Sequence, residues 1–392
     1  MKIYLSKPGV VCCAGLGAEK LWKAVSQGDN SFIKKVKTKT GDEFFAARID
    51  DEALSDSGSR FEQKISKIES AALDQIASVV ESAKQKYGKE RIAVLAGGCD
   101  NGSELSFLAH KRYFECGSFT DGYSLEMQGS SYTASLISEK FSLSGITLSF
   151  STACSSSASA IVKAAELIEA GLCDAAIAGG VDIASDTALL GFSALGAISS
   201  EKTNPMSENR SGITLGDAAA FFVLSKDDLD NTGVYLKGTG ESADAYHMTS
   251  PDPSGAGAVL AMRKAMKRAG VDTSCIDYVN LHGTGTRLND AMEAKALCEV
   301  LGKDIPCSST KSITGHTLGA AGALEGAVCF CALSDKSGVL PLQVWDGEKG
   351  AEIELERIID KRESFGNNAI HCCMSNSFAF GGANVSLIFG KD

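Results

Sequence analysis

One cysteine in this chain lies between a segment typical of a β-strand and a helix built mainly of small residues. Residues 151–157 read Ser-Thr-Ala-Cys-Ser-Ser-Ser. Before them, residues 146–150 alternate as a strand does; after them, residues 158–171 repeat apolar residues at helical spacing and end at a glycine. We therefore expect Cys154 at or just before a helix N-terminus, where the dipole and unpaired N–H groups favour a thiolate. A buried structural role is the alternative, because the chain has 13 cysteines.

Two histidines lie in glycine-rich turns that follow predicted strands. Residues 275–281 predict an apolar-rich strand that leads into His282 and the sequence Gly-Thr-Gly-Thr, which should present the imidazole in an open turn. The segment 309–325 places Lys311 and His316 before a second helix of small residues and Glu325 inside that helix. A single histidine is more often a satisfied core residue than a catalyst. Only five histidines occur here, however, and two of them share this setting.

These motifs, in this order, resemble those of elongating β-ketoacyl-acyl-carrier-protein synthases, which are thiolase-fold condensing enzymes. The resemblance covers nearly the whole chain, from residues 22–25 through 244–251 to the Asn-Ser-Phe-Ala-Phe-Gly-Gly-Ala-Asn stretch at 376–384. It implies an α/β thiolase fold of five layers, αβαβα, built from two pseudo-equivalent halves. Strand and helix signals alternate along the chain, which also favours α/β layering. The charged, turn-forming segment 226–233 predicts a boundary between an N-terminal half, 1–232, and a C-terminal half, 233–392.

Composition excludes several functional classes. The net charge of −11 and the lack of an arginine-rich run disfavour nucleic-acid binding. No Cys-x-x-Cys pair occurs, so neither a zinc site nor a redox motif is predicted. No segment approaches the ~20 apolar residues of a membrane span. The odd number of scattered cysteines is typical of a reducing compartment, and we expect a cytoplasmic protein.

The resemblance implies a role for each motif residue. Cys154 would hold the growing acyl chain as a thioester. His282 and His316, as neutral imidazoles donating from Nε2, would stabilise the enolate that forms when malonyl-carrier protein loses CO₂. Lys311 and Glu325 would form an orienting and electrostatic pair, since an unpaired buried charge is costly.

Further residues surround this set in the resembled family. The backbone N–H groups of Cys154 and Phe380 would form the oxyanion hole. Phe378 and Phe380 would bracket the acyl entrance, with Phe380 as the gate. Thr284 and Thr286 would bind the phosphopantetheine arm, although ordinary turn chemistry is the alternative for both.

Charged residues carry weaker predictions. Asp290 and Glu293 lie one helical turn apart and match acidic family positions, with a capping or solvated role as the alternative. A basic patch should receive the acidic carrier protein, and one stretch resembles the docking helix through Arg60, Lys64 and Lys67. The lysine-rich segment 34–39 is interpreted as a solvated surface loop.

The resemblance implies no cofactor and no metal bound by the enzyme itself, because the substrates arrive on the phosphopantetheine of acyl-carrier protein. The expected partners are that carrier and a second subunit, in a homodimer or in a heterodimer with a related ketosynthase-like chain. The segments 204–207, 210–213 and 216–219 depart from the housekeeping pattern, and segment 97–102 is unusually polar for an acyl pocket. Bulk fatty-acid elongation and a dedicated polyketide or aryl-polyene pathway therefore both stay open.

Other functions remain as alternatives. A biosynthetic thiolase would need a second catalytic cysteine in the loop 376–384, which has none. A chain-initiating synthase would be expected to carry asparagine in place of His316. A non-catalytic, chain-length-controlling subunit typically lacks the nucleophile, whereas Cys154 is present. A cysteine hydrolase using Cys154 and His282 would leave Lys311 and Phe380 without a purpose.

Overall fold

The computed structural model describes the whole chain except residues 61, 101, 367–369 and 392. Two sets of strands have the same order and the same directions. The first set, in spatial order, is β2 (Gly9–Cys12), β10 (Ala218–Ser225), β8 (Ala175–Asp182), β6 (Ile92–Gly97) and β7 (Thr147–Phe150). The second set is β11 (Val234–Ala243), β15 (Ala383–Lys391), β14 (Cys372–Phe378), β12 (Tyr278–Asn280) and β13 (Cys307–Ser308).

In each set the first two pairings are antiparallel and the last two are parallel. This repetition is the structural basis of two pseudo-equivalent halves. The segment 226–233 forms the connection between β10 and β11. The short strand β1 (Ile3–Leu5) pairs with both β10 and β11, so that the two sets join in one continuous sheet.

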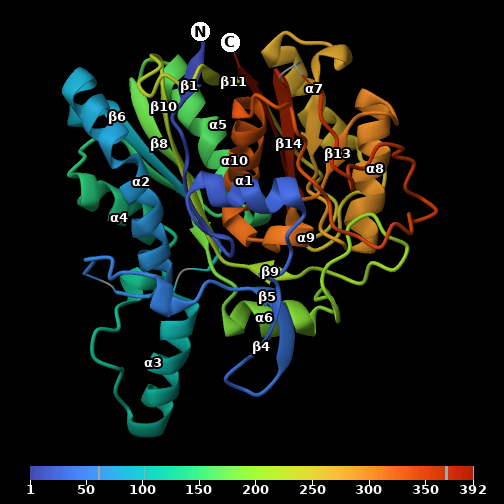
Figure 1. Ribbon diagram of the computed structural model, residues 1–392. Helices are drawn as coiled ribbons and strands as arrows, with labels where there is room; N and C mark the ends of the chain where they lie inside the picture. The colour runs from blue at the N-terminus through green and yellow to red at the C-terminus, as the bar shows by residue number, and fades with distance from the viewer. Residues whose placement is uncertain (61, 101, 367–369, 392) are drawn as a thin grey trace.

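Helices form the other layers (Figure 1). Between the two sets of strands lie α5 (Ser156–Glu169) and α10 (Ala321–Ser334), with α1 (Ala18–Gln27) packed against α10. Helices α2 (Lys64–Tyr87) and α4 (Tyr132–Phe141) cover the outer face of the first set. Helices α7 (Ala256–Ala269) and α8 (Arg287–Leu301) cover the second set. The order is therefore the predicted five layers, αβαβα.

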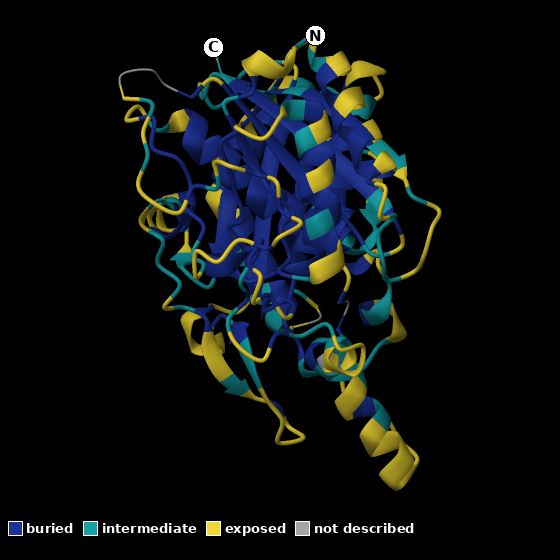
Figure 2. Cartoon of the chain, turned by 90° about the vertical axis from the view of Figure 1, so that its right-hand side faces the viewer, coloured by how far each residue is buried: buried dark blue, intermediate teal, exposed yellow. Residues whose placement is uncertain are grey.

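The central helices explain the small residues noticed in the sequence. A helix enclosed by sheets must be apolar on every side, and α10 is buried from Ala321 to Leu333. Close packing also limits side-chain size, because a Cβ on Gly322 would lie 2.6 Å from the Cβ of Ala158 on α5. Figure 2 shows this buried interior as a continuous dark region with exposed residues on the outer helices.

Smaller elements complete the fold. A second sheet contains β4 (Lys34–Lys37), β5 (Glu43–Ala47) and β9 (Leu215–Gly216), and β3 (Gly15–Leu16) pairs with β2. Helices α3 (Ser103–Cys116) and α6 (Asp186–Ala194) lie below the main sheet in Figure 1, and the short α9 (Lys311–Thr314) precedes α10. Within the described part of the chain, no helix combines the length and apolar character needed to cross a bilayer.

Two sequence expectations about secondary structure are wrong. The strand expected over residues 275–281 is limited to Tyr278–Asn280, because Asp272 accepts a hydrogen bond from the N–H of Ser274 and caps a 3₁₀ turn at Thr273–Cys275. The lysine-rich segment expected to be a loop contains the strand β4, which pairs with β5 and exposes its lysines.

Candidate active site

Cys154 lies in a 3₁₀ turn, Ala153–Ser155, that leads directly into α5. Ala153 has a positive φ of 51°, a conformation that costs an alanine roughly 1–2 kcal/mol. Leu318, in the turn before α10, has a φ of 49°. The two halves thus repeat the same strained turn before their central helices, and in the first half this turn presents the cysteine.

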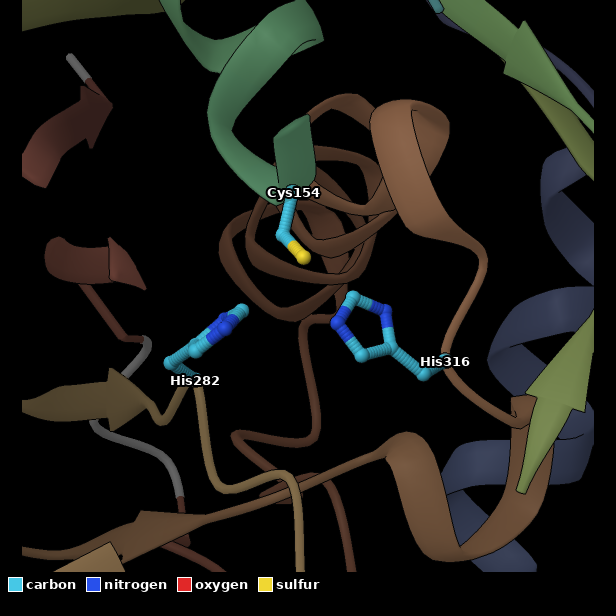
Figure 3. Close-up of side chains that lie close together, drawn as sticks. All are labelled: Cys154, His282 and His316. Atoms are coloured by element: carbon cyan, nitrogen blue, oxygen red, sulfur yellow. The ribbon is translucent and has the colours of Figure 1, made fainter. Parts of the chain in front are cut away.

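Three side chains converge at this point. Figure 3 shows Cys154 pointing from the start of α5 toward His282 and His316. The sulfur of Cys154 and one nitrogen of each imidazole all lie within 4.8 Å of one another, and the two rings are edge-to-face with centroids 5.4 Å apart. The tertiary fold therefore brings together His282 from the loop after β12, His316 from the loop after α9, and Cys154 from the turn before α5.

The expectation that His282 lies in an open turn is wrong, because its exposed fraction is only 1%. The turn is closed by Glu293 on α8, whose carboxylate accepts hydrogen bonds from the N–H groups of His282 and Gly283, both at 2.7 Å. On the same helix, Asp290 accepts hydrogen bonds from the N–H groups of Gly285 and Met206. These two buried acids, left open by sequence as capping or solvated groups, position the histidine loop.

Hydrogen-bond partners determine which nitrogen of each imidazole carries the proton. The backbone N–H of Leu318 donates to Nδ1 of His316 at 3.2 Å. The ammonium of Lys311, which can only donate, lies 3.4 Å from Nδ1 of His282. Both Nδ1 atoms are therefore acceptors, and each neutral ring carries its proton on Nε2. The Nε2–H groups of His282 and His316 are therefore two hydrogen-bond donors beside Cys154.

The same assignment bears on metal binding. Cys154, His282 and His316 have the ligand types and spacing of a zinc site. A metal on Nε2 would require a proton on Nδ1, where Leu318 and Lys311 already donate. The surroundings of the rings thus favour hydrogen-bond donation over metal coordination.

Burial sets the protonation states. It lowers the pKa of His282 and of His316 well below the usual range, and the charge of Lys311 lowers both further. Burial also raises the pKa of Cys154 to about 11, against a smaller lowering by Lys311 and by the backbone N–H of Phe380. The expectation of a resting thiolate at the helix N-terminus is therefore wrong, because loss of solvation outweighs the favourable charges.

Lys311 and Glu325 form the predicted pair. Lys311 on α9 and Glu325 on α10 are almost fully buried and make a short ion pair. Burial raises the pKa of Glu325 to about 7, while Lys311 opposes that rise. Since each charge is compensated by the other, a cation can remain beside His282 in a dry site.

The loop after β14 supplies another donor. The backbone N–H of Phe380 forms a hydrogen bond with the sulfur of Cys154, which places it where the predicted oxyanion hole requires it. Gly381 and Gly382 follow with φ values of 84° and 81°, a conformation that favours glycine. The ring of Phe378 is buried and lies 6.3 Å from that of His282.

Two cavities meet at the cysteine. One, of about 390 Å³, contains Thr284 and Thr286 in its wall, and their hydroxyl oxygens are 3.0 Å apart. The other, of about 1030 Å³, extends along α3. Cys154, Phe192 and Phe380 line both cavities, and the two phenylalanine rings lie 6.0 Å apart. Phe192 could not be predicted from the sequence, because α6 carries no motif.

The three predicted docking residues do not form a free basic patch. The ammonium of Lys64 lies 2.9 Å from the buried carboxylate of Asp217, and its side chain is only 16% exposed. That prediction is wrong for Lys64, because its ammonium faces a buried carboxylate rather than the solvent. Arg60 pairs with Glu126 and Glu139, and Lys67 pairs with Asp56, so the charges of both are compensated at the surface.

Comparisons with known proteins agree with this geometry. Residues 8–229 match the family model "Beta-ketoacyl synthase, N-terminal domain", and residues 234–344 match "Beta-ketoacyl synthase, C-terminal domain". The chain is 32% identical to 3-oxoacyl-[acyl-carrier-protein] synthase 2 of Vibrio cholerae, with 100% of this chain and 99% of the relative covered.

Solved structures show the same fold. A chain in the structure of a ketosynthase in complex with its chain length factor from Xenorhabdus doucetiae is 34% identical, with a TM-score of 0.92 over 100% of this chain and 98% of that one. A β-ketoacyl synthase from Burkholderia phymatum is 27% identical, with a TM-score of 0.85 over 100% and 99%. The chain therefore belongs to the β-ketoacyl synthase family of condensing acyltransferases, with the thiolase fold.

Proposed function

We propose that Cys154, His282 and His316 carry out a decarboxylative Claisen condensation in chain elongation, joining malonyl-carrier protein to an acyl chain held on Cys154. The observation that carries the proposal is the convergence of one thiol and two Nε2–H donors within 4.8 Å. Thioester chemistry needs the nucleophile, and the enolate needs the donors.

In the first half-reaction the sulfur of Cys154 attacks the thioester carbon of an acyl-carrier protein. The oxyanion receives hydrogen bonds from the N–H groups of Cys154 and Phe380. The carbon–sulfur bond to pantetheine breaks, and the departing thiolate takes up the proton that the Cys154 thiol gives up. A pKa of about 11 means that the thiol is neutral at rest, so this proton must leave during the attack.

In the second half-reaction the carbon–carbon bond to the carboxylate of malonyl-carrier protein breaks, and CO₂ departs. The electron pair moves onto the thioester oxygen, which accepts hydrogen bonds from Nε2–H of His282 and of His316. The resulting enolate carbon attacks the acyl carbon on Cys154, the bond to sulfur breaks, and the thiolate takes up a proton from the solvent. The product is a β-ketoacyl chain on the carrier protein, lengthened by the two carbons left from malonate.

The two cavities support separate binding sites for the phosphopantetheine arm and for the acyl chain. The smaller cavity, with Thr284 and Thr286 in its wall, would receive the phosphopantetheine arm, and the larger one would receive the acyl chain. Phe380 lines both beside Cys154, a position suited to a gate between them. No cofactor is needed in these steps, because the arm belongs to the carrier.

We infer acyl-carrier protein and a second ketosynthase-like subunit as partners. The matching structure from Xenorhabdus doucetiae is a complex of a ketosynthase with its chain length factor, which supports a heterodimer here. A homodimer is the other arrangement. The complete catalytic set supports a catalytic rather than a chain-length-controlling role for this chain. All 13 cysteines are free, which supports a reducing, cytoplasmic location.

The test is intact-mass measurement after incubation with a panel of acyl-carrier proteins. The wild-type chain should gain the mass of an acyl group, and Cys154→Ala should gain none. Addition of malonyl-carrier protein should then remove that mass and yield a β-ketoacyl-carrier. Acylation of both proteins, or of neither with any acyl group, would contradict the proposal.

A further inference from the structure

The larger cavity contains polar groups that the condensation does not use. One face of α3 lines it, through Ser103, Ser106, Phe107, His110, Lys111 and Phe114. These positions recur at helical spacing, so this face follows the cavity for roughly 16 Å at 1.5 Å per residue. The hydroxyls of Ser103 and Ser106 already have partners, Asp100 and Nδ1 of His110. The imidazole of His110 is a polar group to which an unsubstituted alkyl chain would offer no partner.

The tautomer of His110 is determined by its own helix. Its Nδ1 lies 2.8 Å from the carbonyl oxygen of Ser106, which can only accept, so Nδ1 carries the proton of the neutral ring. The other nitrogen, Nε2, is therefore an acceptor, and no described residue donates to it. The ring is held edge-to-face against Phe119 and Tyr123, with centroids 5.5 and 5.6 Å away. Phe119 also stacks on Tyr123 with centroids 4.7 Å apart, so the three rings pack against one another.

Gln128 adds the complementary group. Its Oε1 accepts a hydrogen bond from the hydroxyl of Tyr123 at 3.2 Å, and no described residue accepts from its amide nitrogen. Tyr123 thus contacts both His110 and Gln128, and both of these residues line the cavity. A hydroxyl group needs one acceptor for its hydrogen and can take one donor on its oxygen. Nε2 of His110 can accept the hydrogen of such a hydroxyl group, and the amide nitrogen of Gln128 can donate to its oxygen.

We propose that His110 and Gln128 form a subsite for a hydroxyl group carried on the acyl chain away from its thioester end. The chain would lie along α3, with the hydroxyl hydrogen on Nε2 of His110 and the hydroxyl oxygen against the amide of Gln128. This inference rests on the proposed function, because it assigns the acyl chain to the larger cavity. It makes the preferred substrate an acyl group with a remote hydroxyl rather than a saturated alkyl chain.

The test compares matched acyl-carrier proteins that differ only in a terminal hydroxyl, over a series of chain lengths. Acylation of Cys154 is followed by intact mass, and kcat/KM is compared within each pair. At the length that reaches the subsite, the hydroxylated chain should be preferred about tenfold, the upper end of the net gain from one hydrogen bond. His110→Phe keeps a ring against Phe119 and Tyr123 but removes the acceptor, and it should bring the ratio to about one.

Gln128→Leu should reduce the same ratio. The control is His371→Phe, which replaces an exposed histidine just before β14 and should leave the ratio unchanged. A wild-type ratio of one at every length would overturn the subsite, as would a preference that survives both His110→Phe and Gln128→Leu. Efficient acylation by plain and hydroxylated chains alike would overturn only this inference. Failure of every acyl group to reach Cys154 would instead overturn the proposed function on which it rests.

Discussion

The ammonium of Lys311 lies 3.4 Å from Nδ1 of His282, and this contact keeps the proton of the imidazole on Nε2. Lys311 is paired at the same time with Glu325, inside the protein. The lysine therefore acts through the histidine rather than on the substrate: it orients one donor and keeps the ring neutral. Burial strengthens both contacts, because electrostatic interactions are stronger in the low dielectric of the protein interior.

Replacing Lys311 with methionine should separate the two half-reactions. Without the ammonium, the proton of His282 can move to Nδ1, and one donor to the enolate is lost. Release of CO₂ from malonyl-carrier protein should fall by about 10²–10³, the usual effect of losing such a donor, while Cys154 is still acylated. The double variant Lys311→Met/Glu325→Gln removes the unpaired acid and is the control for stability. Recovery of the rate in that double variant would contradict the assigned role.

Replacement of His316 by alanine should have a similar split effect. In the proposed mechanism its Nε2–H is the second enolate donor, and it takes no part in the transfer of the acyl chain to Cys154. We expect acylation by intact mass to persist, and ¹⁴CO₂ release from labelled malonyl-carrier protein to fall by about 10²–10³. Equal losses in both half-reactions would instead place His316 in the activation of the thiol.

The alkylation rate of Cys154 should rise with pH across the neutral and mildly alkaline range. Burial raises its pKa to about 11, and only the thiolate reacts, so the rate should increase about tenfold per pH unit below that value. Cys116 is exposed and its pKa is lowered by Ser118 and Arg112, which makes it the internal control. Peptide mass mapping after iodoacetamide treatment gives both rates. A plateau in the alkylation rate of Cys154 near neutral pH would mean that the helix N-terminus lowers its pKa more than burial raises it.

The substitution Glu293→Gln should loosen the histidine loop. The carboxylate accepts from two backbone N–H groups, whereas a carboxamide keeps one acceptor oxygen and turns a donor toward the second N–H. The free energy of unfolding should fall by about 1–3 kcal/mol, the cost of a buried unsatisfied group, and kcat should fall more than KM rises. Glu299→Gln, at an exposed position of the same helix, should change neither urea unfolding nor kcat.

The free energy of unfolding should fall as the pH rises, because Glu69 is buried without a hydrogen-bond partner in the described part of the chain. Neither of its carboxylate oxygens has a hydrogen-bond partner among the described residues, and burial raises its pKa well above the ordinary value of 4.5. Above pH 4.5 the unfolded chain ionises this group more readily than the folded chain does, so stability falls as the pH rises toward the folded pKa. Glu69→Gln should therefore raise Tm at neutral pH and leave it unchanged below pH 4.5. An equal shift of Tm at both pH values would indicate a packing effect instead.

The elements around Cys154 and the two central helices could be predicted from the sequence, because they depend on residues that are neighbours along the chain. The strand, the turn and the small-residue helix around Cys154 are contiguous, and the same unit recurs before α10. Apolar patterning identified both central helices, since a helix between two sheets must be apolar on every face. The resemblance carried by these motifs then implied the layered fold, which the structure has, and the catalytic set that we propose.

The sequence by itself therefore determined which groups the site contains and the family to which the chain belongs. Only the tertiary structure decided their states: burial, which depends on neighbours far along the chain, makes the thiol of Cys154 neutral and closes the turn of His282. Contacts between distant elements also decided that Lys64 faces Asp217, that Phe192 meets Phe380, and that Lys311 assigns the proton of His282. Solvation and hydrogen-bond partners are properties of the packed molecule, and no local pattern encodes them.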